Sequence, residues 1–125
     1  MTRTILYIED NPQNMRLVRK MLQVGGYNMI EATDGNTGVL LADREHPDLI
    51  LMDINLPDID GMEATRLLKA SSELRHIPVV ALTANAMHGD KERFSEAGCD
   101  GYLAKPVTKN ELLNMIAYYL EHAPV

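Results

Sequence analysis

The sequence lacks several features that would direct a protein to nucleic acid, to a membrane or out of the cell. It has 125 residues, a formal net charge of −6 and no run of basic residues. Its electrostatic field therefore disfavours phosphate backbones, and we expect no direct nucleic-acid partner. No apolar stretch is long enough to cross a bilayer, and no secretory leader precedes the first apolar run. We expect no membrane insertion and a cytoplasmic location.

Residues that bind soft metals or form disulfides are also scarce. Cys99 is the only cysteine, which excludes an internal disulfide and a thiolate metal site and suits a reducing compartment. We expect it to behave as a small, largely buried side chain. The histidines share no plausible ligand spacing, and we expect all of them on the surface or in loops. They are His46, His76, His88 and His122.

The sequence does contain a series of short apolar runs. The most apolar is Leu49–Met52, which is followed by Asp53. A continuous apolar run of this length is typical of a strand buried on both faces of a parallel sheet. Further strands are expected over residues 4–8, 27–32, 77–82 and 101–104, and the more polar run at 27–32 is expected at a sheet edge. The runs therefore predict five strands.

Helix signals separate these runs. Asn11 and Pro12 provide a cap and a first helical residue, and Gly25-Gly26 ends that helix. Thr108 and Glu111 have the spacing of a capping box, the best start signal in the chain, and predict the last helix. Both signals depend on residues within one helical turn of each other.

Three helices between these two are less clearly marked. One follows the turn at residues 34–35 and ends before Pro47, because the residue preceding a proline resists the helical conformation. The next spans residues 61–70, and we expect Ala64, Leu67 and Leu68 to face inward. The third spans residues 87–97 and has few large apolar residues besides Phe94.

Alternating strands and helices predict a parallel sheet with right-handed crossovers. For five strands the common doubly wound order is 2-1-3-4-5, the flavodoxin-like arrangement. The expected fold class is therefore α/β, with five strands and five helices in one domain over residues 1–125. The switch point of this order lies between the first and third strands, so Asp10 and Asp53 are expected to flank one crevice.

Four of the expected strands end in chemically capable side chains, and a parallel sheet brings these ends to one edge. They are Glu9-Asp10, Asp53, Thr83 and Lys105. Clustered carboxylates repel each other unless a proton or a cation intervenes, and a half-open site of oxygen ligands suits Mg²⁺. An aspartate in such a site can attack phosphorus and form an acyl phosphate. Lys105 and Thr83 could then contact the oxygens of the transferred group.

Five short motifs, in this order, resemble the receiver domain of two-component response regulators. They are Ile8–Asn11, Leu51–Pro57, Gly61-Met62, Ala81–Ala84 and Lys105-Pro106, and together they extend over essentially the whole chain. The resemblance implies a signalling protein that accepts a phosphoryl group from a histidine kinase or a histidine phosphotransfer protein. It would then switch a surface that binds a downstream protein target. We expect a monomer that promotes only its own phosphorylation and dephosphorylation, and not an enzyme with sustained turnover.

The resemblance also implies roles for the acidic residues. Asp53 would be the phosphoacceptor. Asp10 would be a direct Mg²⁺ ligand, and Glu9 would act largely through water. Asn55 would contribute its backbone carbonyl to the same ion. Glu9 stands where many receivers have aspartate, and its longer side chain could change the affinity for the metal.

The remaining implied roles concern the phosphoryl group and the response to it. Thr83 and Lys105 would contact the phosphoryl oxygens, and the bond between Lys105 and Pro106 would be cis, which is affordable only before proline. Tyr102 matches the family's switch aromatic, which turns inward when the threonine moves towards the phosphate.

One question of context stays open. Residues 81–87 and 98–102 resemble both single-domain regulators of the cell-division type and the receivers of hybrid histidine kinases. Met1 lies close to the first strand, and the chain ends just after the last helix. We therefore expect a stand-alone receiver with no output domain, and a receiver excised from a hybrid kinase is the alternative.

Two other protein classes fit less well. An aspartate-nucleophile phosphatase of the haloacid-dehalogenase type has its nucleophile after the first strand and a second aspartate two residues on, where Asn55 follows Asp53 here. A flavodoxin-like cofactor carrier would need a phosphate-binding loop after the first strand, where Glu9 and Asp10 would repel a phosphate.

Overall fold

The computed structural model describes residues 2–84 and 90–122. Its sheet consists of β1 (Thr4–Ile8), β2 (Asn28–Ala32), β3 (Leu49–Asp53), β4 (Val79–Thr83) and β5 (Gly101–Ala104). All neighbouring strands are parallel, and their order is β2-β1-β3-β4-β5. The predicted fold class and strand order are confirmed, and the polar strand β2 lies at an edge, as expected.

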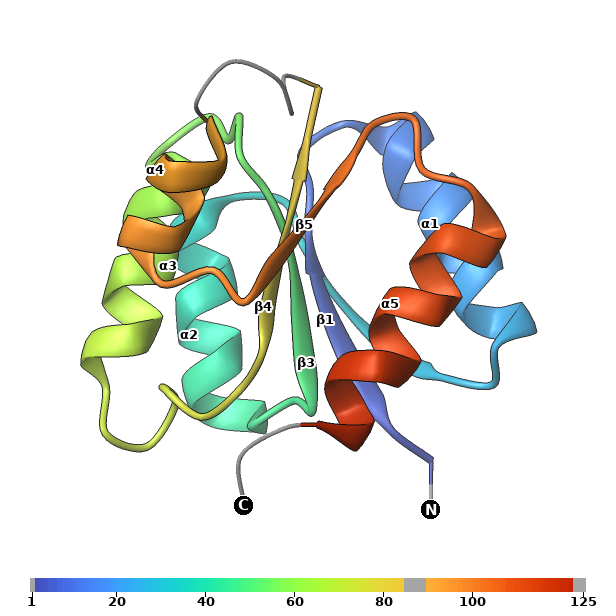
Figure 1. Ribbon diagram of the computed structural model, residues 1–125, viewed down its shortest axis with the longest axis horizontal. Helices are drawn as coiled ribbons and strands as arrows, with labels where there is room; N and C mark the ends of the chain where they lie inside the picture. The colour runs from blue at the N-terminus through green and yellow to red at the C-terminus, as the bar shows by residue number, and fades with distance from the viewer. Residues whose placement is uncertain (1, 85–89, 123–125) are drawn as a thin grey trace.

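The described helices are α1 (Pro12–Val24), α2 (Gly35–Glu45), α3 (Gly61–Ala70), α4 (Asp90–Ala97) and α5 (Lys109–Glu121). Helices α1 and α5 cover one face of the sheet, whereas α2 and α3 cover the other, with α4 beside α3 (Figure 1). Within the described ranges, no helix is both long and apolar enough to span a membrane.

Most of the core lies in two parts because side chains alternate across the strands, and a third, smaller cluster includes Phe94 and Ala97 of α4. Ile5 and Tyr7 of β1 pack with Leu51 of β3 beneath α1 and α5. Leu6 and Ile8 face the other way and pack under α2 and α3. All residues of β3 are buried, as the apolar run predicted.

The predicted caps lie where the sequence indicated. The side chain of Asn11 accepts a hydrogen bond from the Asn14 N–H, and Gly25 follows the last residue of α1. Thr108 and Glu111 form the reciprocal capping box of α5. In α2, Gly38 permits close packing on β1, because a Cβ there would meet the Ile8 side chain at 2.3 Å. This contact explains a glycine that weakens the isolated helix by about 1 kcal/mol relative to alanine.

Some sequence-based expectations differ from the structure. Leu67 does not face inward, since it is 46% exposed. The buried face of α3 instead includes Gly61, Ala64 and Leu68, a spacing of three and four residues that leaves Leu67 to one side. The fourth strand begins at Val79, two residues later than expected.

The scattered residues lie largely where expected. Cys99 is half-buried, with its Sγ 3.8 Å from the Thr65 hydroxyl oxygen. His46, His76 and His122 are exposed. His88 and the expected start of the fourth helix at residues 87–89 lie outside the described residues, whereas its remainder forms α4 with Phe94 buried.

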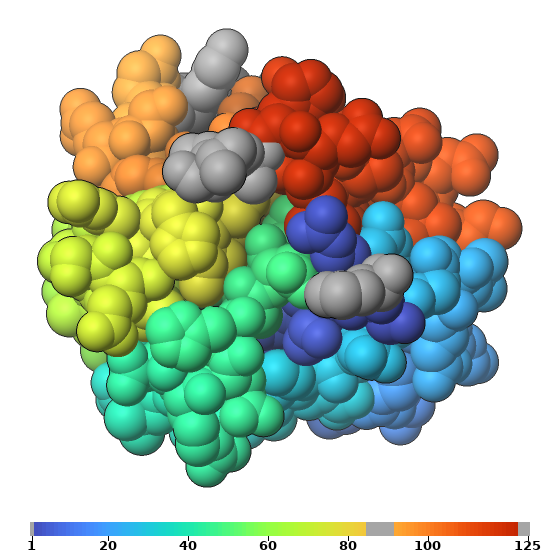
Figure 2. Space-filling view, turned by 90° about the horizontal axis from the view of Figure 1, so that it is seen from below, coloured from blue at the N-terminus to red at the C-terminus, as the bar shows by residue number. Residues whose placement is uncertain are grey.

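The strands all begin at one end of the molecule. There the backbone N–H of Thr4 donates to Asp48 Oδ2 at 2.8 Å, which ties the start of β1 to the start of β3. Figure 2 views this end, with the first residues of the chain beside the segment that leads into β3. The polar residues at the carboxyl ends of the strands lie at the opposite end of the sheet.

Candidate functional site

The strand register brings the predicted site residues to one edge. Ile8 pairs with Met52, so the residues that follow them, Glu9 and Asp53, are neighbours at the ends of β1 and β3. Thr83 ends β4 and pairs with Ala104, which precedes Lys105. Residues far apart in the sequence therefore meet at the switch point, where doubly wound sheets place their ligand sites.

Lys105 joins the two buried carboxylates of the site. Its Nζ donates to Glu9 Oε1 and to Asp53 Oδ1, each at 2.9 Å. Glu9 is 1% exposed and Asp53 is 3% exposed. The ammonium compensates much of their mutual repulsion, which would otherwise be severe between side chains so deeply buried.

Two further donors hold Glu9. The hydroxyl of Tyr7 donates to Glu9 Oε1 at 2.8 Å, and the backbone N–H of Asn11 donates to Oε2 at 3.2 Å. Tyr7 and Glu9 are two residues apart, so their side chains share one side of the β1 segment. The Glu9 carboxylate is thereby fixed by three donors that include Lys105.

Burial and pairing separate the proton affinities of the two carboxyls. Burial raises the pKa of Asp53 to about 6, where the hydrogen bond from Lys105 opposes the rise and Glu9 adds to it. Burial would also raise the pKa of Glu9, but the hydrogen bonds from Lys105 and Tyr7 bring it below its usual value. The same carboxylates raise the pKa of Lys105 despite its burial. The Glu9 carboxyl therefore stays ionised at lower pH than the Asp53 carboxyl.

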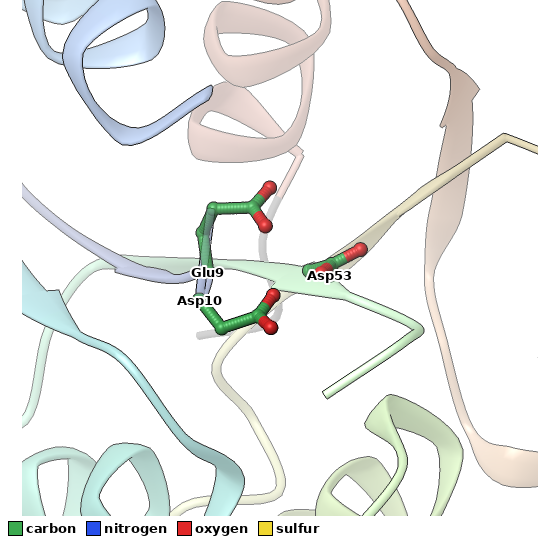
Figure 3. A group of neighbouring side chains, drawn as sticks. All are labelled: Glu9, Asp10 and Asp53. Atoms are coloured by element: carbon green, nitrogen blue, oxygen red, sulfur yellow. The ribbon is translucent and has the colours of Figure 1, made fainter. Parts of the chain in front are cut away.

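The acidic residues suit a hard cation. One carboxylate oxygen each from Glu9, Asp10 and Asp53 lies within 4.8 Å of the others. Figure 3 shows the carboxylates of Glu9 and Asp10 turned towards Asp53 from the end of β1. Asp10 is exposed to solvent, and Asn55 is exposed in the bend after β3. A half-open set of oxygen donors with access to water fits Mg²⁺.

Thr83 ends β4, the strand next to β3, and Tyr102 lies on β5, the strand beyond it. Thr83 is 3% exposed and lines a cavity of about 140 Å³ together with Asn55, Asp60 and Phe94. Tyr102 is half-buried on β5, and its ring centroid lies 5.6 Å from that of Phe94. The peptide bond between Lys105 and Pro106 is cis, as the resemblance implied.

Two residues that hold the site were not anticipated. Tyr7 looked like one more apolar residue of its strand, although its spacing of two from Glu9 was a usable signal. Asp58 accepts hydrogen bonds from the backbone N–H groups of Gly35 and Asn36, each at 2.8 Å. This second contact ties the loop after β3 to the start of α2, and no local pattern indicates it.

Fold and site together define an α/β protein with an acidic, oxygen-rich site at the switch point of a doubly wound sheet. Residues 5–117 match the sequence model of the response regulator receiver domain family. The chain is 46% identical over 123 residues to the polar-differentiation response regulator DivK of Brucella ovis, and this match covers 98% of the chain and 100% of that protein. The chain therefore belongs to the response regulator receiver domain family, and its function is that of a receiver in two-component signalling.

Solved structures agree with this assignment. The receiver domain of the sensor histidine kinase PA1611 from Pseudomonas aeruginosa PAO1 has a TM-score of 0.91 and 40% identity, with 97% of this chain and 99% of that chain covered. That structure contains a magnesium ion coordinated in its active-site cleft. The chemotaxis response regulator CheY4 of Vibrio cholerae has a TM-score of 0.89 and 25% identity, with 94% and 98% covered.

Proposed function

We propose that the protein accepts a phosphoryl group on Asp53 and relays that signal through a change in its protein-binding surface. The observation that carries this proposal is the bridge that Lys105 Nζ makes to Glu9 and Asp53. This bridge places the Lys105 ammonium against the buried Asp53 carboxylate, beside two further acidic residues. A purely structural ion pair would not need the additional, exposed carboxylate of Asp10 at the same point.

Asp10 and Asp53 would hold Mg²⁺ directly, with the backbone carbonyl of Asn55, and Glu9 would act largely through water. When bound, the ion supplies positive charge that offsets the repulsion between the acidic residues and the incoming phosphoryl oxygens. The spacing of the carboxylate oxygens within 4.8 Å supports this ligand set. The magnesium in the cleft of the Pseudomonas receiver supports it as well.

In the transfer step, a carboxylate oxygen of Asp53 attacks the phosphorus of a phosphohistidine. The new P–O bond forms as the P–N bond breaks, and its electron pair returns to the imidazole of the donor. Lys105 already lies against Asp53 and could follow the charge onto the phosphoryl oxygens. The Thr83 hydroxyl could donate to one of those oxygens. The donor would be a histidine kinase or a histidine phosphotransfer protein.

The response to the transfer would pass through Thr83 and Tyr102. Phosphorylation adds about −1.5 to −2 charges at the crevice. Movement of Thr83 towards this charge would change the space beside Phe94, against which Tyr102 packs. Tyr102 would then turn inward and alter the surface that a downstream protein target recognises.

The context proposed is a stand-alone cytoplasmic receiver that acts as a monomer, without an output domain. The full-length match to DivK supports this reading. The match to a receiver of a sensor histidine kinase supports the alternative, a receiver excised from a hybrid kinase. In both cases the protein would promote only its own phosphorylation and dephosphorylation.

The test is phosphorylation by a small acyl phosphate, read by intact mass. The wild type should gain one phosphoryl group in the presence of Mg²⁺ and none in the presence of a chelator. Asp53→Asn should gain none under either condition, because the amide lacks the nucleophilic carboxylate. Asp43→Asn, which changes an exposed aspartate on α2, is the matched control and should behave like the wild type. Phosphate on Asp53→Asn would show that the acceptor is another residue.

A further inference from the structure

Tyr7 is a buried phenol that lies between the apolar residues Leu6 and Ile8 of β1. Its side chain is fully buried, and its hydroxyl donates to Glu9 Oε1 at 2.8 Å. A phenol hydroxyl that leaves water needs a hydrogen-bond partner, and the adjacent carboxylate is a strong acceptor. Burial and the neighbouring Glu9 charge both raise the pKa of Tyr7, so the phenol keeps the proton that it donates.

Two donors converge on the same oxygen of Glu9. Oε1 accepts from the Tyr7 hydroxyl and also from Lys105 Nζ at 2.9 Å. A carboxylate oxygen has two lone pairs in its plane, so both directions at Oε1 are occupied. Oε2 accepts from the Asn11 N–H at 3.2 Å. Glu9 could therefore coordinate a cation through Oε1 only by losing one of its donors, whereas the second lone pair of Oε2 is left to accept from a bridging water.

A restraint on the Glu9 carboxylate matters because the glutamate side chain is long enough to move. Glutamate has one methylene more than aspartate, and its carboxylate already lies within reach of those of Asp10 and Asp53. Without a fixed orientation it could swing onto the cation as a further direct ligand. The Tyr7 hydroxyl holds it instead on the side of Lys105.

We propose that Tyr7 is a positioning residue that keeps Glu9 in an outer, water-mediated role and so lowers the affinity of the site for Mg²⁺. This inference rests on the proposed function, since it needs the cation site formed by Asp10 and Asp53. Tyr7 itself touches neither the cation nor the phosphoryl group. Its effect passes entirely through the orientation of one carboxylate.

Calorimetric titration with Mg²⁺ alone, without any phosphodonor, tests the inference. Tyr7→Phe removes one hydroxyl and keeps the ring that fills the core. Release of Oε1 should tighten Mg²⁺ binding by about three- to tenfold, the effect of one hydrogen bond of ordinary strength. In a Glu9→Gln background the same substitution should leave the affinity unchanged, because no carboxylate remains to be released.

Tyr119→Phe is the matched control. It also removes a phenol hydrogen bond, from the Tyr119 hydroxyl to the Asp100 carbonyl at 2.6 Å, but it lies at α5 and away from the acidic cluster. Its Mg²⁺ affinity should equal that of the wild type. General loosening of the fold would weaken Mg²⁺ binding, so the sign of the change separates positioning from a structural role.

Three results would count against the inference, and they have different meanings. Unchanged or weaker Mg²⁺ binding by Tyr7→Phe, with normal binding by the wild type, would overturn this inference and leave the proposed function standing. Absence of saturable Mg²⁺ binding by the wild type would overturn the proposed cation site and the inference together. A tighter Tyr7→Phe site whose gain persists in the Glu9→Gln background would also overturn the inference, because the effect would not pass through Glu9.

Discussion

Lys105 places one ammonium against two buried carboxylates, with Nζ 2.9 Å from both Glu9 Oε1 and Asp53 Oδ1. Removing the amine leaves both carboxylates without the neighbouring ammonium, but each can be stabilised in another way. Glu9 keeps its hydrogen bonds from Tyr7 and Asn11. Asp53, whose pKa is already raised to about 6, can take up a proton or share a bound cation. The residue is therefore suited to sensing the phosphoryl group without being essential to the fold.

Lys105→Ala is accordingly expected to fold but to lose the link between phosphorylation and the output surface. Its free energy of unfolding should fall by about 1–2 kcal/mol, less than for a fully enclosed ion pair because the site is half-open. Hydrogen exchange of β4 and β5, compared before and after treatment with acyl phosphate and Mg²⁺, measures the link. The wild type should show changed exchange and Lys105→Ala should not. Lys109→Ala, an exposed lysine at the start of α5, should respond like the wild type. An undiminished response in Lys105→Ala would contradict the role.

At the scale of elements, α2 and the loop after β3 are joined by one carboxylate. Asp58 accepts from the N–H groups of Gly35 and Asn36, while Asp34 accepts from the N–H of Thr37. Together they satisfy N–H groups that a helix start leaves without partners, where the helix dipole also favours negative charge. Desolvation would raise the pKa of Asp58, but these backbone hydrogen bonds hold it at about 2.

Asp58→Asn should therefore destabilise the protein in a pH-dependent way. A carboxyl whose folded pKa is depressed contributes stability above its unfolded pKa of about 4, and loses it as the pH falls through the folded value near 2. Urea unfolding should show a deficit relative to the wild type that is constant from pH 7 to about 5 and shrinks towards pH 3. Asp43→Asn, which changes an exposed aspartate within α2, should show no comparable deficit. A deficit for Asp58→Asn that is independent of pH would rule out the charge as its cause.

The helix caps and the Asp58 contact show why some features could be predicted from the sequence and others could not. The Asn11 and Thr108 caps depend on partners three residues away, so a short motif contains the whole interaction. Asp58 reaches a helix start more than twenty residues earlier, which becomes possible only after the sheet has ordered both segments. Leu67 was misplaced because the buried face of α3 includes small residues such as Gly61 and Ala64, which mark an inward face less clearly than large apolar residues do.

At the scale of the whole molecule, the site could be located from the sequence because a parallel sheet delivers all its carboxyl ends to one edge. That argument placed Asp53, Thr83 and Lys105 together, although they come from three separate strand ends. It could not give the atoms in contact. The convergence of Tyr7 and Lys105 on one oxygen depends on the register of β1 against β3 and on side-chain lengths, which no spacing rule encodes.

The proposed cation site would link the global stability of the protein to Mg²⁺. The proposed ligands lie directly after β1, at the end of β3 and in the loop that follows β3, so they are assembled only in the folded chain. A cation that binds the folded state alone should raise the free energy of unfolding by about 1.4 kcal/mol for each tenfold increase in concentration above its dissociation constant. Chemical unfolding at a series of Mg²⁺ concentrations measures this slope.

Asp10→Asn provides the decisive variant for this dependence. Asp10 is exposed, so its replacement should change the stability without Mg²⁺ only slightly. It removes a proposed direct ligand, however, so the rise in stability should begin at a higher Mg²⁺ concentration than in the wild type. Glu73→Gln, an exposed acid between α3 and β4, should follow the wild-type curve. Coincident curves for Asp10→Asn and the wild type would mean that Mg²⁺ stabilises the fold by general screening of a protein with net charge −6, and not at the acidic cluster.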